Sequence, residues 1–341
     1  MKIGSLFSGG GGGDLGFTNS GHEIVFGCEI EPKARSVFRY HHPNIPIYHD
    51  VQEVTRERLT ADGVPFPELI MGGSPCQDLS MAGKRAGLGG ERSGLFHEQC
   101  RIADELGSKW VVWENVAGAF SSNAGEDFAA VLGGLTGTTH AVPKGGWRNA
   151  GVCVGPNRVA VYRVLNAQNF GVPQQRRRVF VVAGPRTLAR RVVEVLLEPE
   201  SGNRDTSTRR KAQQNSSPSS VYGTDTPNSM NDAPFAAFDS TWSGRYPLNN
   251  PGDISPTIKV GGSGAPPAIA IGDNPIVRKL TPLECERLMG WPDDWTSSGI
   301  TDDGELVEIA NTNRYRICGN GIVSPVTQWI AGRLPEMKRQ L

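Results

Sequence analysis

The residue types best suited to chemistry in this chain are one cysteine, one glutamate and two arginines. Cys76 follows a short apolar run that stops at two glycines, so the run predicts a buried strand that delivers the thiol to a sheet edge. Glu114 ends a second apolar run, and Arg176 and Arg178 stand just before a third. A lone cysteine usually packs as a small, inert hydrophobe, so Cys76 becomes a candidate nucleophile only if its neighbours support it.

The sequence that flanks these residues predicts the loop and the strands that would position them. Beyond Gln77 the chain is small, Gly-rich and basic, which suits a loop that closes over an anionic ligand. Trp110 to Trp113 reads as the strand that carries Glu114. Tyr162 to Leu165 and Val179 to Ala183 read as an antiparallel strand pair that brings the arginines to the same region.

The N-terminal stretch has the features of a nucleoside-cofactor site. A strand over Lys2 to Phe7 runs into Ser8 and five consecutive glycines, Gly9 to Gly13, where a ligand could approach the backbone closely. A second strand, Glu23 to Cys28, ends at Glu29, where a ribose would need a paired acceptor. Residues 49–51 close a third short strand, and Asp50 could accept from an adenine amino group or equally cap the next helix.

Strands and helices alternate through this half of the chain, which predicts an α/β fold with a doubly wound parallel sheet. Helices are expected over Pro32 to Tyr40 and Leu95 to Leu106. In such sheets ligands bind at the carboxyl ends of the strands, so the Gly-rich turn, Glu29, Asp50, Cys76 and Glu114 should share one edge. Residues Gly133 to Pro156 read as Gly-rich and irregular.

The second half of the chain predicts a smaller, loop-rich unit. Ser201 to Pro234 is polar with few large apolar residues and reads as a flexible surface segment. Thr281 to Met289 reads as a helix with a capping box, and a final amphipathic helix is expected from Val323 to Leu334 beside the first strand.

Composition narrows the class of protein. The 341 residues include 35 basic and 35 acidic side chains, so the net charge of zero does not advertise a nucleic-acid partner. Six cysteines lie far apart with no Cys/His spacing suited to zinc, and no metal is expected. The N-terminus lacks a signal-peptide pattern and no run is long enough for a membrane helix, which predicts a cytoplasmic protein, nucleoid-associated in a bacterium or in the host cytoplasm if phage-encoded.

Taken in order, the segments resemble the DNA (cytosine-5) methyltransferase family over nearly the whole chain outside about 186 to 275. The segments that carry the resemblance are Phe7-Ser-Gly-x-Gly-Gly12, Glu29, Asp50, Ser74-Pro-Cys-Gln77, Glu114-Asn-Val116, Gln174-x-Arg176-x-Arg178, Arg278 to Glu284 with Met289-Gly-Trp-Pro292, and Gly319-Asn320. Each is weak alone, whereas the ordered set is highly specific.

The resemblance implies a Rossmann-like fold with S-adenosylmethionine as methyl donor and carbon 5 of a flipped-out cytosine as acceptor. Cys76 would add to carbon 6 of the ring, Glu114 would protonate or hydrogen-bond ring nitrogen 3, and Arg178 with Arg176 would hold the carbonyl oxygen. The implied cofactor contacts are Phe7, Ser8, Gly9, Gly11, Glu29, Ile30, Asp50, Val51, Leu95 and Asn320.

The resemblance also implies double-stranded DNA as partner and a monomeric enzyme. The implied DNA contacts are Gln77, Ser80, Lys84, Arg85, Arg92 and Thr257. Residues 1–187 with 316–341 would form the large catalytic domain, and 188–315 the small target-recognition domain.

Three alternatives stay open on the sequence. The first is a cytosine-5 methyltransferase of RNA, although the chain lacks the Cys-Phe-Thr tripeptide of the transfer-RNA subgroup. The second is a catalytically inactive DNA-binding relative. The third is a nicotinamide oxidoreductase, disfavoured because the Gly-rich turn would then have to cradle a pyrophosphate.

Overall fold

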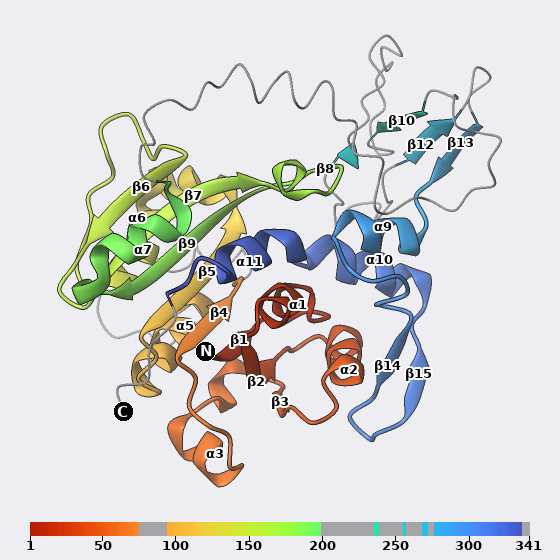
Figure 1. Cartoon of the computed structure of the whole chain (residues 1–341), viewed down its shortest axis with the longest axis horizontal. Helices are drawn as coiled ribbons and strands as arrows, with labels where there is room; N and C mark the ends of the chain where they lie inside the picture. The colour runs from red at the N-terminus through yellow and green to blue at the C-terminus, as the bar shows by residue number, and fades with distance from the viewer. Residues whose placement is uncertain (75–93, 199–234, 239–254, 257–267, 272–275, 336–341) are drawn as a thin grey trace.

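The protein is built on an eight-stranded sheet with the strand order β3-β2-β1-β4-β5-β9-β7-β6 (Figure 1). The computed structural model describes residues 1–74, 94–198, 235–238, 255–256, 268–271 and 276–335. The strands of the sheet are β1 (Lys2–Leu6), β2 (Glu23–Cys28), β3 (Ile47–Tyr48), β4 (Leu69–Gly72), β5 (Trp110–Val116), β6 (Ala150–Val154), β7 (Arg158–Asn166) and β9 (Arg177–Pro185). This is the mixed α/β architecture that the sequence predicts.

The sheet has a parallel half and an antiparallel half. Strands β3, β2, β1, β4 and β5 pair in parallel, whereas β9 pairs antiparallel with both β5 and β7, and β7 pairs antiparallel with β6. The chain runs outward from β1 to β3 and then returns to β4 on the other side of β1. The strand order therefore reverses between β1 and β4, the place where open α/β sheets bind ligands.

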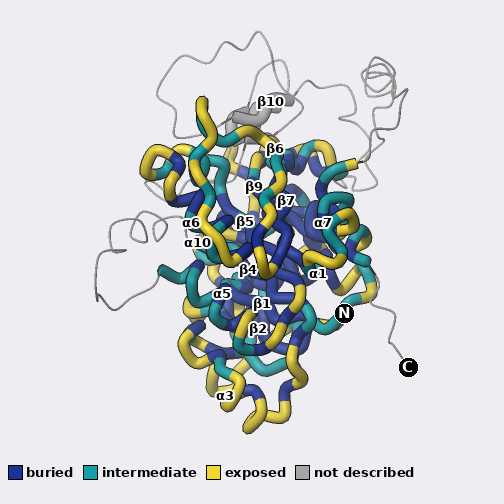
Figure 2. The backbone as a smooth tube through the Cα atoms, turned by 90° about the vertical axis from the view of Figure 1, so that its left-hand side faces the viewer, coloured by how far each residue is buried: buried dark blue, intermediate teal, exposed yellow. Residues whose placement is uncertain are grey.

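Helices cover both faces of the sheet and bury it. Figure 2 shows the central strands as the buried interior, with exposed residues concentrated on the outer helices and turns. One face packs against α1 (Gly12–Asn19), α2 (Pro32–His41), α7 (Ala189–Leu196) and α11 (Ser324–Ala331). The other packs against α3 (Arg56–Ala61), α5 (Leu95–Glu105) and α6 (Glu126–Thr136).

The remaining elements follow the large sheet in sequence. Short strands pair as β10-β12-β13, β11-β8 and β14-β15. Their bounds are β8 (Gln174–Gln175), β10 (Phe235–Phe238), β11 (Ser255–Pro256), β12 (Ala268–Ile271), β13 (Ile276–Lys279), β14 (Ser298–Ile300) and β15 (Leu306–Glu308). Helices α9 (Pro282–Leu288) and α10 (Asn311–Asn320) precede α11, and short 3-10 turns lie at Val51–Glu53, Ala117–Phe120, Ser122–Gly125, Ala167–Phe170 and Arg186–Leu188.

Helix α9 confirms the predicted capping box. The Thr281 hydroxyl accepts the backbone N–H of Glu284 at 3.2 Å, and the Glu284 carboxylate accepts the backbone N–H of Thr281 at 2.7 Å. Two of the N–H groups that have no partner within the helix are thereby satisfied. The antiparallel pairing of residues 162–165 with 179–183 is likewise confirmed in β7 and β9.

The irregular excursion predicted for residues 133–156 is wrong at both of its ends. Residues up to Thr136 belong to α6, and Ala150–Val154 form the edge strand β6. A Cβ atom on Gly134 would lie 3.1 Å from Phe96, so glycine here permits close packing of α6 on α5 rather than a loop. Strand β6 was missed because an edge strand is half exposed and lacks a continuous apolar run.

The short strand that residues 49–51 were expected to close is present and ends at Tyr48. The strand is Ile47–Tyr48, and Asp50 caps the 3-10 turn that follows, with its carboxylate accepting the N–H of Gln52 at 2.9 Å. The final helix is α11, shorter than predicted. It packs against α1, the helix that follows the first strand, and α10, which precedes it, was not predicted.

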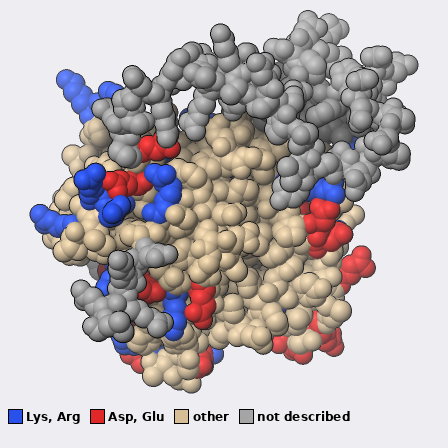
Figure 3. Space-filling model, viewed as in Figure 1, with Lys and Arg blue, Asp and Glu red and all other residues tan. Residues whose placement is uncertain are grey.

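Charged side chains are mixed on the face in Figure 3, where basic and acidic groups lie next to each other over the region of β6, β7 and α7. On α7, Arg190 and Arg191 pair with Glu194 at 2.8 and 3.4 Å. These two arginines therefore lie on a locally neutralised, solvated helix face. Among the described helices, none has the length and hydropathy needed to span a bilayer.

Candidate active site

The sheet brings the predicted polar residues to one edge, as expected. The Gly-rich turn follows β1, Glu29 follows β2, and Gly73 and Ser74 follow β4. Glu114 lies near the end of β5, which runs parallel to β4. Because β9 runs the opposite way, its first residues lie at this same edge, and Arg178 pairs in register with Val116.

Glu114 and Arg178 form an ion pair at this edge. The Arg178 Nε lies 3.2 Å from a Glu114 carboxylate oxygen, and both side chains are largely buried. Burial raises the pKa of Glu114, and the positive charges of Arg178 and Arg176 offset part of that rise. A carboxyl group held in this way can retain a proton and donate it, which suits a general acid.

Arg176 is buried and serves a different contact. Its Nη2 donates to the backbone carbonyls of Gly319 and Gly321 at 3.0 and 2.7 Å. Burial and the charge of Arg178 lower the pKa of Arg176 to about 9, so the side chain remains a cation at neutral pH. The arginine thus ties the turn between α10 and α11 to the site.

Trp113 and Asn115 hold Ser74, at the start of the segment that leads to Cys76. The sequence did not indicate either of them as a site residue. Asn115 Nδ2 donates to the Ser74 carbonyl at 2.9 Å, and Trp113 Nε1 donates to the Ser74 hydroxyl at 3.0 Å. Asn115 and Ser74 are each 4% exposed, so this bond joins two buried polar groups. Asn115 was visible beside Glu114 in the sequence, but only the pairing of β4 with β5 shows what it contacts.

The backbone of the Gly-rich turn has the conformation of a ligand cradle. Gly9 and Gly11 have φ values of 57° and 83°, and Phe7 has a φ of 53° although it is not glycine. A Cβ atom on Gly9 would meet nothing within 4 Å, so the loop leaves open space on that side. Ser8 is buried and joins β1 to β2, because its hydroxyl accepts the N–H of Cys28 at 3.1 Å.

Glu29 fixes the turn from the neighbouring strand. Its carboxylate accepts the backbone N–H of Gly9 at 2.8 Å and that of Glu31 at 2.8 Å, and burial raises its pKa. Ile30 beside it is 71% exposed, an unusual exposure for a large apolar residue at a strand end. An open glycine turn, a carboxylate and an exposed apolar side chain fit the ribose and adenine of S-adenosylmethionine.

The other predicted cofactor residues lie around this edge and differ in burial. Val51 is buried, Asp50 is half-buried and caps its turn, and Leu95 begins α5. Asn320 is exposed at the end of α10, between the two glycines whose carbonyls Arg176 binds. No group of three or more potential metal ligands occurs among the residues that the structure describes.

The cysteines other than Cys76 are poor nucleophiles. Cys28, Cys100, Cys285 and Cys318 are buried and Cys153 is half-buried. Burial raises the pKa of every one of these thiols, and no described opposite charge outweighs it. Cys76 itself lies outside the described residues, as do the predicted DNA contacts Gln77, Ser80, Lys84, Arg85, Arg92 and Thr257.

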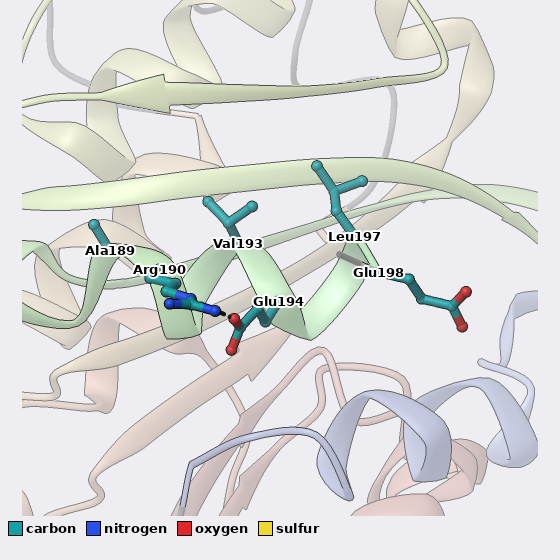
Figure 4. A pocket seen from close by; sticks show the side chains of 6 residues that line it. All are labelled: Ala189, Arg190, Val193, Glu194, Leu197 and Glu198. Atoms are coloured by element: carbon teal, nitrogen blue, oxygen red, sulfur yellow. Dashed lines mark hydrogen bonds and ion pairs between the residues drawn. The ribbon is translucent and has the colours of Figure 1, made fainter. Parts of the chain in front are cut away.

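A shallow hollow on α7 is separate from these residues. Figure 4 shows its lining side chains, Ala189, Arg190, Val193, Glu194, Leu197 and Glu198. None of them is a predicted site residue, and α7 packs on β7 and β9 rather than at the strand ends. The strand-end geometry, not this hollow, defines the candidate active site.

Comparison with known proteins identifies the family. The family of C-5 cytosine-specific DNA methylases matches residues 1–220 and 198–336. The chain belongs to this family. It is therefore a DNA (cytosine-5) methyltransferase that uses S-adenosylmethionine, as the order of its segments predicted. This excludes the nicotinamide oxidoreductase alternative.

The individual relatives are methyltransferases by name. The chain is 29% identical over 345 residues to the type II methyltransferase M2.BsuMI of Bacillus subtilis, covering 99% of this chain and 76% of that protein. It is 26% identical to the type II methyltransferase M.Bsp6I of a Bacillus species, covering 97% of both. A protein of Escherichia phage P1 named as a DNA N-6-adenine-methyltransferase is also 26% identical, and the chain covers 61% of its length.

Solved structures show the same fold. A protein described as a DNA modification methyltransferase encoded within an E. coli prophage aligns over 98% of both chains with a TM-score of 0.57 and 16% identity. The S. pombe Dnmt2 methyltransferase aligns over 98% of both chains, also with a TM-score of 0.57, at 18% identity. Both structures thus share the fold of the part of the chain that the structure describes.

Proposed function

We propose that Cys76, Glu114 and Arg178, with Arg176 in support, carry out methylation of carbon 5 of a cytosine in a specific DNA sequence. The observation that carries the proposal is the buried Glu114–Arg178 pair at 3.2 Å, next to the end of the strand that leads to Cys76. The raised thiol pKa of the five described cysteines supports Cys76 as the nucleophile. Asn115 would fix the start of the Cys76 loop through the Ser74 carbonyl.

The proposed reaction proceeds through a covalent adduct. The Cys76 thiolate adds to carbon 6 of the cytosine while Glu114 donates a hydrogen bond or proton to ring nitrogen 3, so carbon 5 gains enamine character. Arg178 holds the ring carbonyl oxygen and disperses its charge. Bound S-adenosylmethionine supplies the methyl group. Loss of the carbon 5 proton to a base then re-forms the 5,6 double bond and breaks the sulfur–carbon 6 bond, which releases Cys76.

We propose that the open glycine turn, Glu29 and Ile30 form the core of the cofactor pocket. Glu29 would accept from the ribose hydroxyls while retaining the Gly9 N–H that it already binds at 2.8 Å. Ile30, 71% exposed, would pack on the adenine. Phe7, Ser8, Gly11, Asp50, Val51, Leu95 and Asn320 would complete the pocket.

DNA binding is proposed for the regions on either side of this pocket. A base inside a duplex is out of reach, so the cytosine must be flipped out at a cost of about a few kcal/mol. Gln77, Ser80, Lys84, Arg85 and Arg92 would close on the flipped nucleotide and its phosphates. Thr257 and the rest of the small domain, proposed at 188–315, would read the sequence.

We further propose that the enzyme acts as a monomer in the cytoplasm. Glu114, Arg178, the glycine turn and Glu29 all come from one chain and already meet at one edge of its own sheet. A dimer partner is therefore not needed to complete the site. Light scattering with and without a DNA duplex would measure the active stoichiometry.

Replacement of the nucleophile tests the chemistry. Cys76→Ser should abolish methyl transfer to duplex DNA while leaving DNA binding intact, whereas the matched control Cys153→Ser, which alters a half-buried thiol on the edge strand, should keep activity. DNA carrying 5-fluorocytosine at the target should trap a covalent adduct only when S-adenosylmethionine is present. Retained activity in Cys76→Ser would overturn the mechanism.

Identification of the product tests the substrate atom. Nucleoside mass spectrometry of DNA from cells expressing the protein should show 5-methylcytosine, and bisulfite sequencing should place it in one recurring sequence. Recovery of N6-methyladenine in its place, as the name of the phage P1 relative would suggest, would overturn the cytosine assignment. Methylation of transfer RNA but not of duplex DNA would favour the RNA alternative.

A further inference from the structure

The carbonyl groups of the glycine turn are held by side chains from the last fifth of the chain. Trp295 Nε1 donates to the Gly10 carbonyl at 2.7 Å. Ser324 donates to the Gly12 carbonyl at 2.6 Å, and Thr327 donates to the Gly13 carbonyl at 3.0 Å. The turn is therefore fixed from outside as well as by its own backbone.

Of these three bonds, the one from Trp295 acts on the turn itself. Gly12 and Gly13 already belong to the first turn of α1, whereas Gly10 lies between the two positive-φ glycines. Gly9 and Gly11 need that unusual conformation to present the backbone to a ligand. Trp295 is thus placed to control the segment proposed to touch the cofactor.

Trp295 is itself held rigidly by His41 of α2. The two rings stack with centroids 3.5 Å apart and planes 5° from parallel, and the His41 Nε2 donates to the Trp295 carbonyl at 2.7 Å. Burial lowers the pKa of His41, so the stacked ring is neutral at physiological pH. Trp295 is 9% exposed, which leaves its indole little room to rotate.

A buried ionic network fixes the backbone around Trp295. The Glu286 carboxylate, fully buried, accepts the N–H of Thr296 at 2.9 Å and pairs with Arg314 at 2.8 Å. Arg314 also bonds to Asp294 at 3.1 Å, and Asp294 has a φ of 58°, a conformation that costs energy for a residue other than glycine. Several contacts therefore fix the backbone on both sides of Trp295.

We propose that Trp295 is a positioning residue that holds the glycine turn in its cofactor-binding conformation through the Gly10 carbonyl. This inference rests on the proposed cofactor pocket. Without the indole N–H, the turn samples other conformations and the cofactor must select the competent one, which reduces apparent affinity. The transfer step itself does not involve Trp295, so the maximal rate at saturating cofactor stays the same.

The test compares two tryptophan-to-phenylalanine variants that each lose one indole N–H bond to a glycine carbonyl. Trp295→Phe keeps the ring that stacks on His41. The control, Trp147→Phe, loses a bond of 2.8 Å to the Gly125 carbonyl within the aromatic cluster around Phe128. Calorimetry with S-adenosylhomocysteine and steady-state kinetics with duplex DNA are run on both.

Trp295→Phe should raise the Kd for S-adenosylhomocysteine and the KM for S-adenosylmethionine about three- to tenfold, the range expected for one hydrogen bond, with kcat unchanged. Trp147→Phe should leave both constants at the wild-type value. If Trp295→Phe fails to fold, His41→Ala, which removes the stacking partner, should raise KM in the same direction. Equal cofactor constants in the two tryptophan variants, or a fall in kcat with KM unchanged, would overturn the inference.

A third variant separates this inference from the pocket on which it rests. Glu29→Ala should greatly weaken cofactor binding if the proposed pocket is correct. Weak binding in Glu29→Ala together with wild-type binding in Trp295→Phe would reject only the role of Trp295. Wild-type binding in Glu29→Ala would reject the pocket, and the role of Trp295 with it.

Discussion

The parallel and antiparallel halves of the sheet place functional groups at the same edge, but their strands reach that edge in opposite directions. In the parallel half, β1, β2, β4 and β5 bring their carboxyl ends to this edge, and each end is followed by a turn, a carboxylate or the loop to Cys76. In the antiparallel half, β9 starts there, so its first residues, including Arg178, face Glu114. One half therefore supplies the acidic and backbone groups, and the other supplies the cation.

The difference shows why one reversed strand matters for this chemistry. A strand that starts at the ligand edge can present a side chain at its first positions while the rest of the strand remains buried between two neighbours. Arg178 pairs in register with both Val116 of β5 and Leu165 of β7, so strands on both sides fix its backbone. A cation on a free loop would lose more side-chain and backbone entropy when it binds the carboxylate.

The largest effect is expected from the carboxylate of the parallel half. Glu114→Gln keeps the shape but cannot release a proton to ring nitrogen 3, so kcat should fall about 10²- to 10⁴-fold, the usual range for a general acid. Single-turnover kinetics with saturating DNA and cofactor would measure the loss. The control Glu98→Gln, whose carboxylate pairs with Arg101 within α5, should keep the wild-type rate. A wild-type rate in Glu114→Gln would show that this carboxylate of the parallel half does not act in the reaction.

Loss of the cation from the antiparallel half should have a smaller effect. Arg178→Gln removes a charge-assisted contact of about 1.5–3 kcal/mol, so the rate should fall about 10- to 150-fold. The pH profile should also change. Arg178 lowers the pKa of Glu114, so removing it raises that pKa and keeps Glu114 protonated to higher pH. The loss of activity on the alkaline side of the pH profile should then occur at a higher pH. An unchanged profile would show that the two halves are not coupled.

Overpacking of α1, the first helix of the parallel half, should lower the stability of the protein. A Cβ atom at position 12 would lie 2.1 Å from Trp291, so Gly12→Ala must displace the indole and should cost about 1–3 kcal/mol of unfolding free energy. Urea unfolding would measure it. Gly118→Ala, whose Cβ would lie 3.8 Å from Val116, is the matched control and should be nearly neutral. Equal stability of the two variants would contradict the tight packing.

The smallest effect is expected where the outer hairpin β14-β15 meets the parallel half. Asp302 pairs with Arg35 of α2 at 2.5 Å and with Arg39 at 2.8 Å, and its side chain is 41% exposed. Asp302→Asn should therefore cost no more than about 1 kcal/mol. The two arginines lower the Asp302 pKa below its usual 3.8, so the stabilisation is present above about pH 4 and is lost as the pH falls further. Wild-type and variant stability should converge in acid, as thermal unfolding across pH would show.

The features that the sequence predicted correctly are local or depend on the pairing of neighbouring strands. The capping box at Thr281 is fixed by residues three apart, and the alternation of strands and helices places Glu29 and Glu114 at one edge without further information. The family resemblance then supplied the roles. Local patterns failed at α6, where Gly134 serves close packing against α5, and at the half-exposed β6.

Long-range side-chain contacts could not be predicted from any sequence pattern. Asn115 bonds to the carbonyl of Ser74, 41 residues away, and Arg176 bonds to that of Gly321, 145 residues away. A backbone carbonyl has no residue type to mark it as a partner. Only the register of the strands and the path of the last helices bring these donors to their acceptors.

The separation between the glycine turn and its donors has a consequence for biosynthesis. The carbonyls of Gly10, Gly12 and Gly13 accept from residues 285, 312 and 314 positions further along the chain. The turn is thus synthesised long before the side chains that hold it, and such distant pairings slow folding. Nascent chains that stop short of α11 would contain Glu29 and Glu114, yet two of the three donors that hold these carbonyls would be missing.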